Sequence, residues 1–372
     1  MSADSDFEIL LVTVPGLEAI LCAEAKALGF RSPAVMTGGV TVRGDWRDVW
    51  RANLCLRGVS KVLIRVGSFP VAHLAQLDKR ARRFPWQEFL SPTVPVRVEA
   101  TCKASRIYHA GATKERIERA ITEELGAPID EDADLCVKVR LHNDLCTISL
   151  DTSGDGLHKR GHKEAVNKAP MRETMAALFL RQCGFTGSEP VCDLMCGSGT
   201  FPIEAAEIAA NLWPGRSRHF AFETLPSFDA SAWQALKDSA KPRQPTHRYF
   251  GSDRDPGAIR ISQENAERAG VSTYTEFRHS TISEAQRPEG PPGLVILNPP
   301  YGTRLGDKKK LGGLYRSIGQ TLSSRFHGWR VGLITSDQSL AKATGLPFTT
   351  PHAPVLHGGL RVTLYTTPPL AE

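Results

Sequence analysis

The sequence has no uninterrupted apolar run of about 18 residues, and its first residues show no signal-peptide pattern. These absences argue against a membrane-spanning helix and a secretory leader, so we expect a soluble, cytoplasmic protein. Its eight cysteines include no CxxC pair. Cys192 and Cys196 are four residues apart, but they fall on a predicted strand end and a loop rather than on one ligand-bearing helix face. We therefore expect reduced thiols and no metal site.

The chain also has little excess of either charge: its formal net charge is +6 and its sequence pI is about 8.9 over 372 residues. A mild basic excess is compatible with a polyanionic partner but does not by itself indicate one. With 41% apolar and 23% charged residues, the composition is ordinary for a soluble protein and does not indicate disorder. The chain is longer than domains with a single hydrophobic core usually are, so we expect two or three domains.

Residues 1–66 are expected to form a small α+β domain. Apolar alternation predicts strands, and apolar residues at helical spacing between turn and cap residues predict helices. The predicted elements are a strand at 7–14, a helix at 17–28, a strand at 39–43, a helix that follows Asp45 and a strand at 59–66. This order is typical of a ferredoxin-like sandwich.

Residues 67–152 are expected to form a second α+β domain. Its predicted elements are a strand at 94–102, a helix at 113–125 and a hairpin of strands at 135–141 and 145–150. Cations stand ahead of the helix, at Lys103 and Arg106, and in its first half, at Lys114, Arg116 and Arg119. Cations near a helix start oppose the helix dipole, so an anion outside the domain can compensate them.

A basic stretch at 79–86 interleaves four cations with two aromatic residues. The cations are Lys79, Arg80, Arg82 and Arg83, and the aromatic residues are Phe84 and Trp86. One interpretation is a solvated basic helix or loop. The other is a surface that contacts phosphates and stacks a base on an aromatic ring.

Residues 153–168 are interpreted as a linker, because turn-forming Gly and Asp residues begin at Asp151 and a basic, glycine-bearing run follows. The run contains Lys159, Arg160 and Lys163. Its charge alone fits two interpretations equally: a solvated linker, or a grip on a nucleic-acid backbone where two domains meet.

Residues 169–372 alternate predicted strands and helices, which indicates a doubly wound, mostly parallel sheet. Short apolar runs end at Asp193, Asp253 and Asn298. An unusually long insertion, residues 211–247, separates the first of these strands from the second. In such a sheet the loops that follow the strands open on one carboxyl edge, where ligands bind.

The first of these loops carries two glycines, Gly197 and Gly199, between an apolar run and a predicted helix. A strand–glycine–helix junction lets a ligand approach the backbone closely, and it is typical of nucleotide-type sites. The carboxylate of Asp253 can accept hydrogen bonds from both hydroxyls of a ribose. Because Asp253 lies 54 residues after Gly199 and no third glycine is present, the pattern disfavours a dinucleotide site.

The third loop reads Asn298-Pro299-Pro300-Tyr301. An exocyclic amine on an aromatic ring is a poor nucleophile, because its lone pair is delocalised. The side-chain carbonyl of Asn298 and the backbone carbonyl of Pro299 can accept its N–H groups and direct the lone pair at an incoming methyl group. Two prolines stiffen this geometry, and Tyr301 offers a face on which a base can stack.

With these residues together, the chain resembles the class I S-adenosylmethionine (SAM)-dependent RNA methyltransferases that carry a THUMP RNA-binding domain. It is most similar to the bacterial 23S rRNA guanine-N2 methyltransferases and their tRNA relatives. The resemblance is carried by Asp151-Thr152-Ser153-Gly154 with Lys159-Arg160-Gly161, Ala169-Pro170-Met171-Arg172-Glu173-Thr174, Asp193 to Thr200, Gly251 to Pro256, and Asn298 to Gly302. It implies a ferredoxin-like domain at 1–66, a THUMP domain at 67–152, a linker at 153–168 and a Rossmann-like methyltransferase domain at 169–372.

The resemblance also implies roles for individual residues. The cofactor-binding residues would be Asp193, Met195, Cys196, Gly197, Gly199, Thr200, Asp253, Arg254 and Asn298. The catalytic residues would be Asn298, Pro299, Pro300 and Tyr301, and the RNA-binding residues would be Lys79, Arg80, Arg82, Arg83, Lys103, Arg106, Lys159, Arg160 and Lys163. Relatives usually place an acid near the adenine amine, whereas Phe277-Arg278-His279-Ser280-Thr281 contains none.

The expected reaction is direct transfer of a methyl group from SAM to the exocyclic N2 of a guanine in structured RNA, without a metal or a covalent enzyme intermediate. The guanine would have to be splayed out of its stack to reach the cofactor. The expected substrate is 23S rRNA, and tRNA is the alternative. A protein glutamine methyltransferase and a non-catalytic RNA-binding protein are two further alternatives.

Overall fold

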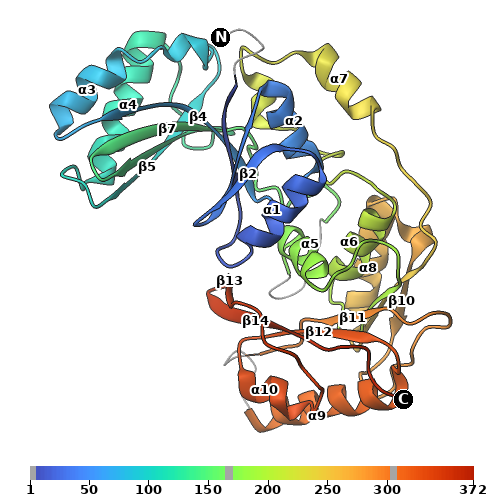
Figure 1. Ribbon diagram of the computed structural model, residues 1–372. Helices are drawn as coiled ribbons and strands as arrows, with labels where there is room; N and C mark the ends of the chain where they lie inside the picture. The colour runs from blue at the N-terminus through green and yellow to red at the C-terminus, as the bar shows by residue number, and fades with distance from the viewer. Residues whose placement is uncertain (1–5, 164–170, 302–307) are drawn as a thin grey trace. The chain divides into compact units, whose positions relative to one another are not determined.

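A computed structural model describes residues 6–163, 171–301 and 308–372 (Figure 1). The chain divides into two units, and each is described by itself. Unit 1 comprises Met1–Thr13, Leu21–Leu157 and Arg218–Ser239, and unit 2 comprises Val14–Ile20, His158–Ser217 and Ala240–Glu372. Within the described ranges, no helix is both long enough and apolar enough to cross a membrane.

The first part of the chain contains seven strands and their helices. In chain order they are β1 (Phe7–Val12), α1 (Glu18–Ala27), β2 (Arg31–Met36), β3 (Gly39–Gly44), α2 (Trp46–Cys55), β4 (Lys61–Pro70), α3 (Leu74–Arg82), η1 (Trp86–Glu88), β5 (Val96–Lys103), α4 (Ala110–Leu125), β6 (Leu135–His142) and β7 (Leu145–Asp151). The strands form one sheet in the order β2-β3-β1-β4-β7-β6-β5. Helices α3 and α4 lie side by side on this sheet (Figure 1).

The N-terminal element order is β-α-β-β-α-β. The sequence predicted β-α-β-α-β, because it gave no sign of strand β2. This strand pairs with β3 at the edge of the sheet, through a register that shifts between Arg31 and Ala34. Its residues are exposed or half-buried, so it has no apolar alternation, and it contains Pro33 and a positive φ of 51° at Ser32. Such irregular, polar edge strands leave little trace in hydrophobic periodicity.

Strand β4 joins the two α+β modules of unit 1 into one sheet. It pairs with β1 on one side and with β7 on the other. It also runs through residues 66 and 67, where we expected a boundary between two domains. The two modules therefore share a continuous hydrogen-bonded sheet at this position.

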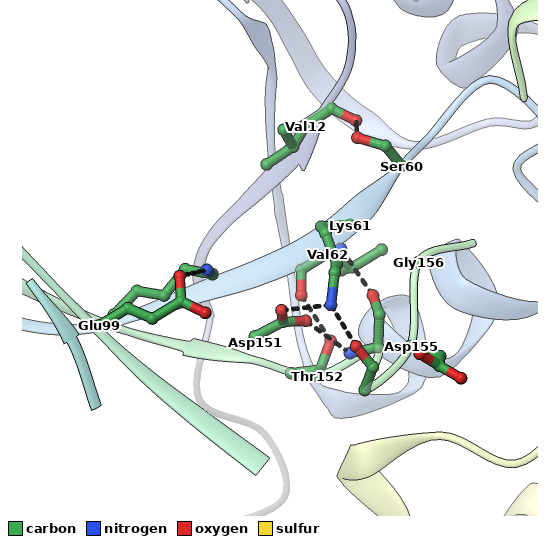
Figure 2. A network of polar contacts seen from close by, with 12 residues as sticks. Val12, Ser60, Lys61, Val62, Glu99, Asp151, Thr152, Asp155 and Gly156 are labelled. Carbon is green, nitrogen blue, oxygen red and sulfur yellow. Dashed lines mark hydrogen bonds and ion pairs between the residues drawn. The ribbon is translucent and has the colours of Figure 1, made fainter. Parts of the chain in front are cut away.

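The segment Asp151-Thr152-Ser153 is buried in unit 1 and is not part of a solvated linker. Figure 2 shows Asp151 and Thr152 beside Lys61 and Val62. Lys61 lies across from it, with Nζ 2.8 Å from the Asp151 carboxylate. The hydroxyl of Thr152 donates to the Val62 carbonyl at 2.8 Å. The Ser153 hydroxyl accepts from the Val62 amide at 2.8 Å and donates to Asn53 Oδ1 at 2.8 Å. These buried bonds fasten the end of β7 to β4 and α2.

Part of the predicted insertion belongs to unit 1 rather than to the doubly wound sheet. The part is Arg218–Ser239, which contains η2 (Ala221–Thr224) and α7 (Ala230–Asp238). Trp50 of α2 contacts three of its aromatic rings, with centroid distances of 5.8–6.5 Å to Phe222, Phe228 and Trp233. The aromatic residues of the insertion thus form a small core with α2.

Unit 2 contains the doubly wound sheet. Its elements are α5 (Glu173–Gln182), β8 (Val191–Asp193), α6 (Thr200–Ala209), β9 (Tyr249–Asp253), α8 (Pro256–Arg268), η3 (Ser272–Tyr274), β10 (Thr275–His279), β11 (Leu294–Leu297), α9 (Lys308–Arg325), β12 (Arg330–Thr335), α10 (Gln338–Ala343), β13 (Val355–His357) and β14 (Leu360–Thr366). The strand order is β10-β9-β8-β11-β12-β14-β13. The five neighbouring strands β10, β9, β8, β11 and β12 are parallel. Helices α5, α6 and α8 lie on one side of the sheet and α9 and α10 on the other (Figure 1). The predicted α/β class is confirmed.

Candidate active site

The glycine loop connects β8 to α6. Gly197 and Gly199 both have left-handed backbone conformations, with φ of 56° and 80°. At Gly199 a Cβ atom would also lie 3.1 Å from Ile203, Phe277 and Ser262, whereas at Gly197 it would meet open space. Gly199 is therefore required by both conformation and packing, and Gly197 by conformation alone.

The two acids of the site lie at the ends of adjacent strands. The Gly197 amide donates to Asp253 Oδ2 at 3.0 Å, and the Cys196 amide donates to the Ser252 carbonyl at 2.9 Å. The loops that follow β8 and β9 are thus bonded into one structure. Asp253 also accepts from the Asp255 amide, and its lone pairs leave room for further donors such as ribose hydroxyls.

Asp193 is buried beside this loop, and it accepts a hydrogen bond from the Met195 amide at 3.0 Å. Burial raises the pKa of its carboxyl to about 8, and the nearby charge of Asp253 adds to the rise. A buried acid of this kind is complementary to a cationic ligand group. The side chains of Cys196 and Thr200 are buried in the same loop, Met195 is half-buried, and Arg254 is exposed beyond Asp253.

A cavity of about 620 Å³ opens beside the same strand ends. It is lined by Leu194, Ser252, Ser280 and Glu284, among others. The hydroxyl oxygen of Ser252 is buried and makes no hydrogen bond with the described part of the chain. An unpartnered buried hydroxyl at a cavity wall suits a polar ligand.

Glu284 is a site residue that the sequence reasoning missed. The hydroxyl of Thr281 donates to its Oε2 at 2.7 Å, and this hydrogen bond lowers the pKa of the Glu284 carboxyl. The stretch 277–281 indeed contains no acid, but Glu284 brings one to the cavity wall three residues later. The Thr-x-x-Glu spacing, which resembles a capping box, was the available signal.

The third loop follows β11, a fully buried strand that pairs with β8. Asn298 therefore extends from the same carboxyl edge as Asp193. Its Oδ1 atom is buried and accepts no hydrogen bond from any residue that the structure describes. Pro299 is buried and Pro300 and Tyr301 are half-buried, and the Pro300 carbonyl accepts from the Tyr315 hydroxyl at 3.4 Å. Gly302 lies outside the described residues.

The predicted RNA-binding cations of unit 1 fall into two groups. Lys79, Arg80, Arg83 and Lys103 are exposed. Arg82 instead pairs with Asp78, Glu123 and Glu124, and Arg106 lies 3.4 Å from Asp144, although its side chain is 74% exposed.

Two contacts bear on the alternatives that the sequence left open for this surface. Trp86 is buried, and its Nε1 donates to the Ala81 carbonyl at 2.8 Å, so it offers no face for a base. The cations of α4 need no outside anion at two positions, because Lys114 pairs with Glu131 and Arg119 pairs with Asp78.

The basic run of the predicted linker is only partly exposed to solvent. Lys159 is exposed. Arg160 is 2% exposed and lies 3.3 Å from the carboxylate of Glu204 on α6. Lys163 is 10% exposed and contacts Glu173 and Thr200. Neither side chain is open to solvent in this structure, and RNA binding by Arg160 and Lys163 stays a prediction.

Among the residues that the structure describes, no group of three or more His, Cys, Asp or Glu side chains is arranged to hold a metal ion. The polar groups at the site suit an organic cofactor. They are the backbone at Gly197, where a Cβ would meet open space, the carboxylate of Asp253, the buried acid Asp193 and the unpartnered hydroxyl of Ser252.

Comparison with known families matches nearly the whole chain. A ferredoxin-like domain described for RlmL matches residues 8–63, a THUMP domain matches residues 71–151, and a methyltransferase domain described as RMKL-like matches residues 160–364. A protein of Synechocystis sp. named as a candidate RNA methyltransferase, slr0064, is 31% identical over 94% of this chain and 93% of its own length.

Two further relatives bear on the cofactor and on the length. The ribosomal RNA large subunit methyltransferase K/L of Psychromonas ingrahamii is 35% identical over 90% of this chain. The match covers 46% of that protein, so this chain spans about half the length of the K/L relative. A solved structure named as a candidate methyltransferase, SMU.472, in complex with S-adenosylhomocysteine (SAH), has a TM-score of 0.88 at 26% identity and covers 99% of this chain and 98% of its own.

Proposed function

We propose a function from one premise: the chain belongs to the THUMP-containing, RlmL-like family of SAM-dependent RNA methyltransferases. Its cofactor is SAM. The reaction that the site supports best is methylation of the exocyclic N2 of a guanine in structured RNA. The most suitable substrate is 23S rRNA, with tRNA as the alternative, and both are compatible with a cytoplasmic protein.

One observation carries the choice of an amine as the acceptor. Asn298 Oδ1 is buried at the carboxyl edge of the sheet and has no donor among the described residues. A buried acceptor without a donor costs free energy, of the order of 1–3 kcal/mol, unless a ligand supplies the missing N–H. An exocyclic amine of a base is such a donor.

The residues of the chain then act mainly by binding and orientation. SAM supplies an electrophilic methyl group on its sulfonium. Asp253 accepts from the ribose hydroxyls, and the glycine loop leaves room for the methionine part. The carbonyls of Asn298 and Pro299 accept the two amine N–H groups and turn the nitrogen lone pair toward the methyl carbon. As the N–C bond forms, the C–S bond breaks, and one amine proton is lost to water.

The RNA would contact unit 1 through the exposed side of its sheet. A groove of about 370 Å³ lies there, lined by Arg140, His142, Thr101 and Thr147, among others. Lys103 is opposite His142 in the β5–β6 register and is exposed. Cations and hydroxyls of this kind suit phosphates and ribose hydroxyls. Arg140→Ala and Lys103→Ala would each weaken RNA binding and reduce its salt dependence by about one counterion.

The test is methylation of RNA from a strain that lacks this protein, with methyl-labelled SAM, followed by nuclease digestion and separation of nucleosides. Label in N2-methylguanosine of the large-subunit rRNA is expected, and label in tRNA would favour the alternative substrate. Label in another nucleoside, or in protein glutamine, would overturn the proposal. If the protein binds SAM but labels none of these, it is a non-catalytic RNA-binding protein.

A further inference from the structure

The most unexpected feature of unit 2 is that the basic segment His158–Lys163 is bonded to the glycine loop. The Lys163 ammonium lies 2.9 Å from Thr200 Oγ1, 2.8 Å from Glu173 Oε1 and 3.2 Å from the Met171 carbonyl. Thr200 is the first residue of α6 and directly follows Gly199. The contacts with Thr200 and Met171 are hydrogen bonds, and the contact with Glu173 is an ion pair in which Oε1 accepts no hydrogen bond from the described residues.

A second chain of contacts reaches the same loop through α8. The Arg268 guanidinium donates to the His162 carbonyl at 2.8 Å and to Asn265 Oδ1 at 2.6 Å. Asn265 in turn donates to the Ser198 carbonyl at 3.0 Å. The segment is therefore linked to both residues that flank Gly199.

The space between the segment and the loop is small. The cavity that remains there is about 10 Å³, which is the size of one water molecule, and its lining includes Lys163, Glu173, Ser198 and Thr200. No phosphate fits into it. Lys163 is 10% exposed and Glu173 is 7% exposed, so the ion pair is also weakly screened by solvent.

The position of the Lys163 charge is unfavourable for α6 alone, because a cation near a helix N-terminus opposes the helix dipole. Glu173, the first residue of α5, provides the compensating anion at a position where the dipole of α5 favours it. The ion pair thus fixes Lys163 between the first turns of α5 and α6. Helix α6 directly follows the glycine loop.

We propose that Lys163 is a positioning residue of the SAM site, which holds Thr200 and with it the glycine loop in the conformation that receives the cofactor. This inference rests on the SAM site and not on the identity of the methylated base. Lys163 does not touch the reacting atoms. Its removal lets the loop sample other conformations, so part of the SAM binding energy is spent on ordering it.

The experiment is SAM binding by calorimetry with the full-length protein and no RNA. Lys163→Met is expected to raise the Kd for SAM about tenfold, the usual effect of one hydrogen bond to a charged group. The matched control, Lys159→Met, removes an exposed cation four residues earlier and should leave the Kd for SAM at the wild-type value. At saturating SAM, kcat of Lys163→Met should stay within about twofold of wild type, so the loss appears in KM for SAM.

A double-mutant cycle assigns the effect to the contact with Thr200. Thr200→Val removes the hydroxyl, and in that background Lys163→Met should change the Kd for SAM less than about twofold. The full tenfold loss in both backgrounds, which means no energetic coupling between the two positions, would overturn the proposed route through Thr200. An unaltered Kd for SAM together with weaker RNA binding would make Lys163 an RNA contact instead.

A folding defect is distinguished by a conservative variant. Lys163→Arg keeps the charge and the donors and should recover at least part of the lost SAM affinity. If Lys163→Met lowers the melting temperature in the absence of SAM and Lys163→Arg restores that temperature without restoring SAM affinity, the role is purely structural and the proposal is wrong.

Discussion

The Gly197 amide donates a hydrogen bond to the carboxylate of Asp253, with N and Oδ2 3.0 Å apart. This bond joins loops that are 56 residues apart in the chain. It means that the acid expected to hold the cofactor ribose also holds the glycine loop. We therefore expect substitutions of Asp253 to affect both the loop and the contact with the ribose.

We expect Asp253→Asn to weaken SAM binding by about 10- to 100-fold, because both the loop and the ribose lose a charged acceptor. Calorimetric titration with SAM measures the change. Asp255→Asn is the matched control: it sits two residues later and caps α8 by accepting from the Gly257 amide. It should lower the melting temperature slightly and leave SAM affinity unchanged. Equal losses of affinity in both variants would contradict the role of Asp253.

Asn298→Ala should keep SAM binding and lose most methyl transfer. The side-chain carbonyl is needed to orient the amine, and removal of one such polar group typically costs about 100- to 1,000-fold in kcat. Turnover under saturating SAM and RNA measures this, with SAM binding recorded on the same sample. Asn298→Asp, which keeps the shape but adds a charge, separates geometry from electrostatics. Turnover at the wild-type level in Asn298→Ala would remove Asn298 from the mechanism.

The pKa of Asp193, about 8 in the folded protein against an ordinary value of 3.8, predicts a pH-dependent stability. Because the folded state holds the proton more tightly, its contribution to stability is fully present below pH 4 and is lost as pH rises toward 8. The loss should approach about 1.4 kcal/mol per pH unit within this window.

Urea unfolding of the free protein at several pH values measures this dependence. Asp193→Asn cannot ionise, so wild type should lose stability relative to this variant as pH rises from 5 to 8. A difference between the two that stays constant over this range would show that the carboxyl of Asp193 titrates normally.

The two loop glycines should respond differently to alanine. Gly199→Ala adds a strained φ and a Cβ atom 3.1 Å from three side chains, so we expect a loss of stability above about 1 kcal/mol and weaker SAM binding. Gly197→Ala adds the strain alone and should lose about 1 kcal/mol or less. Unfolding midpoints of the two variants measure the contrast. A larger loss at Gly197 would contradict the packing argument.

The cofactor and the methyltransferase class could be predicted from the sequence because they depend on short-range signals. Two glycines after an apolar run, an acid at a strand end and an Asn-Pro-Pro corner are each complete within a few residues. The α/β alternation of the second half is local in the same sense. The topology of parallel strands then requires that loops such as those at Asp193, Asp253 and Asn298 share one edge.

Only the tertiary structure decided what the charged and aromatic residues do. Arg160 and Lys163 look like nucleic-acid contacts in the sequence, but their anions, Glu204 and Glu173, lie 44 and 10 residues away. Trp50 likewise packs with rings more than 170 residues later. Local sequence specifies which residues are charged or apolar, whereas their partners are set by long-range packing, which no periodicity records.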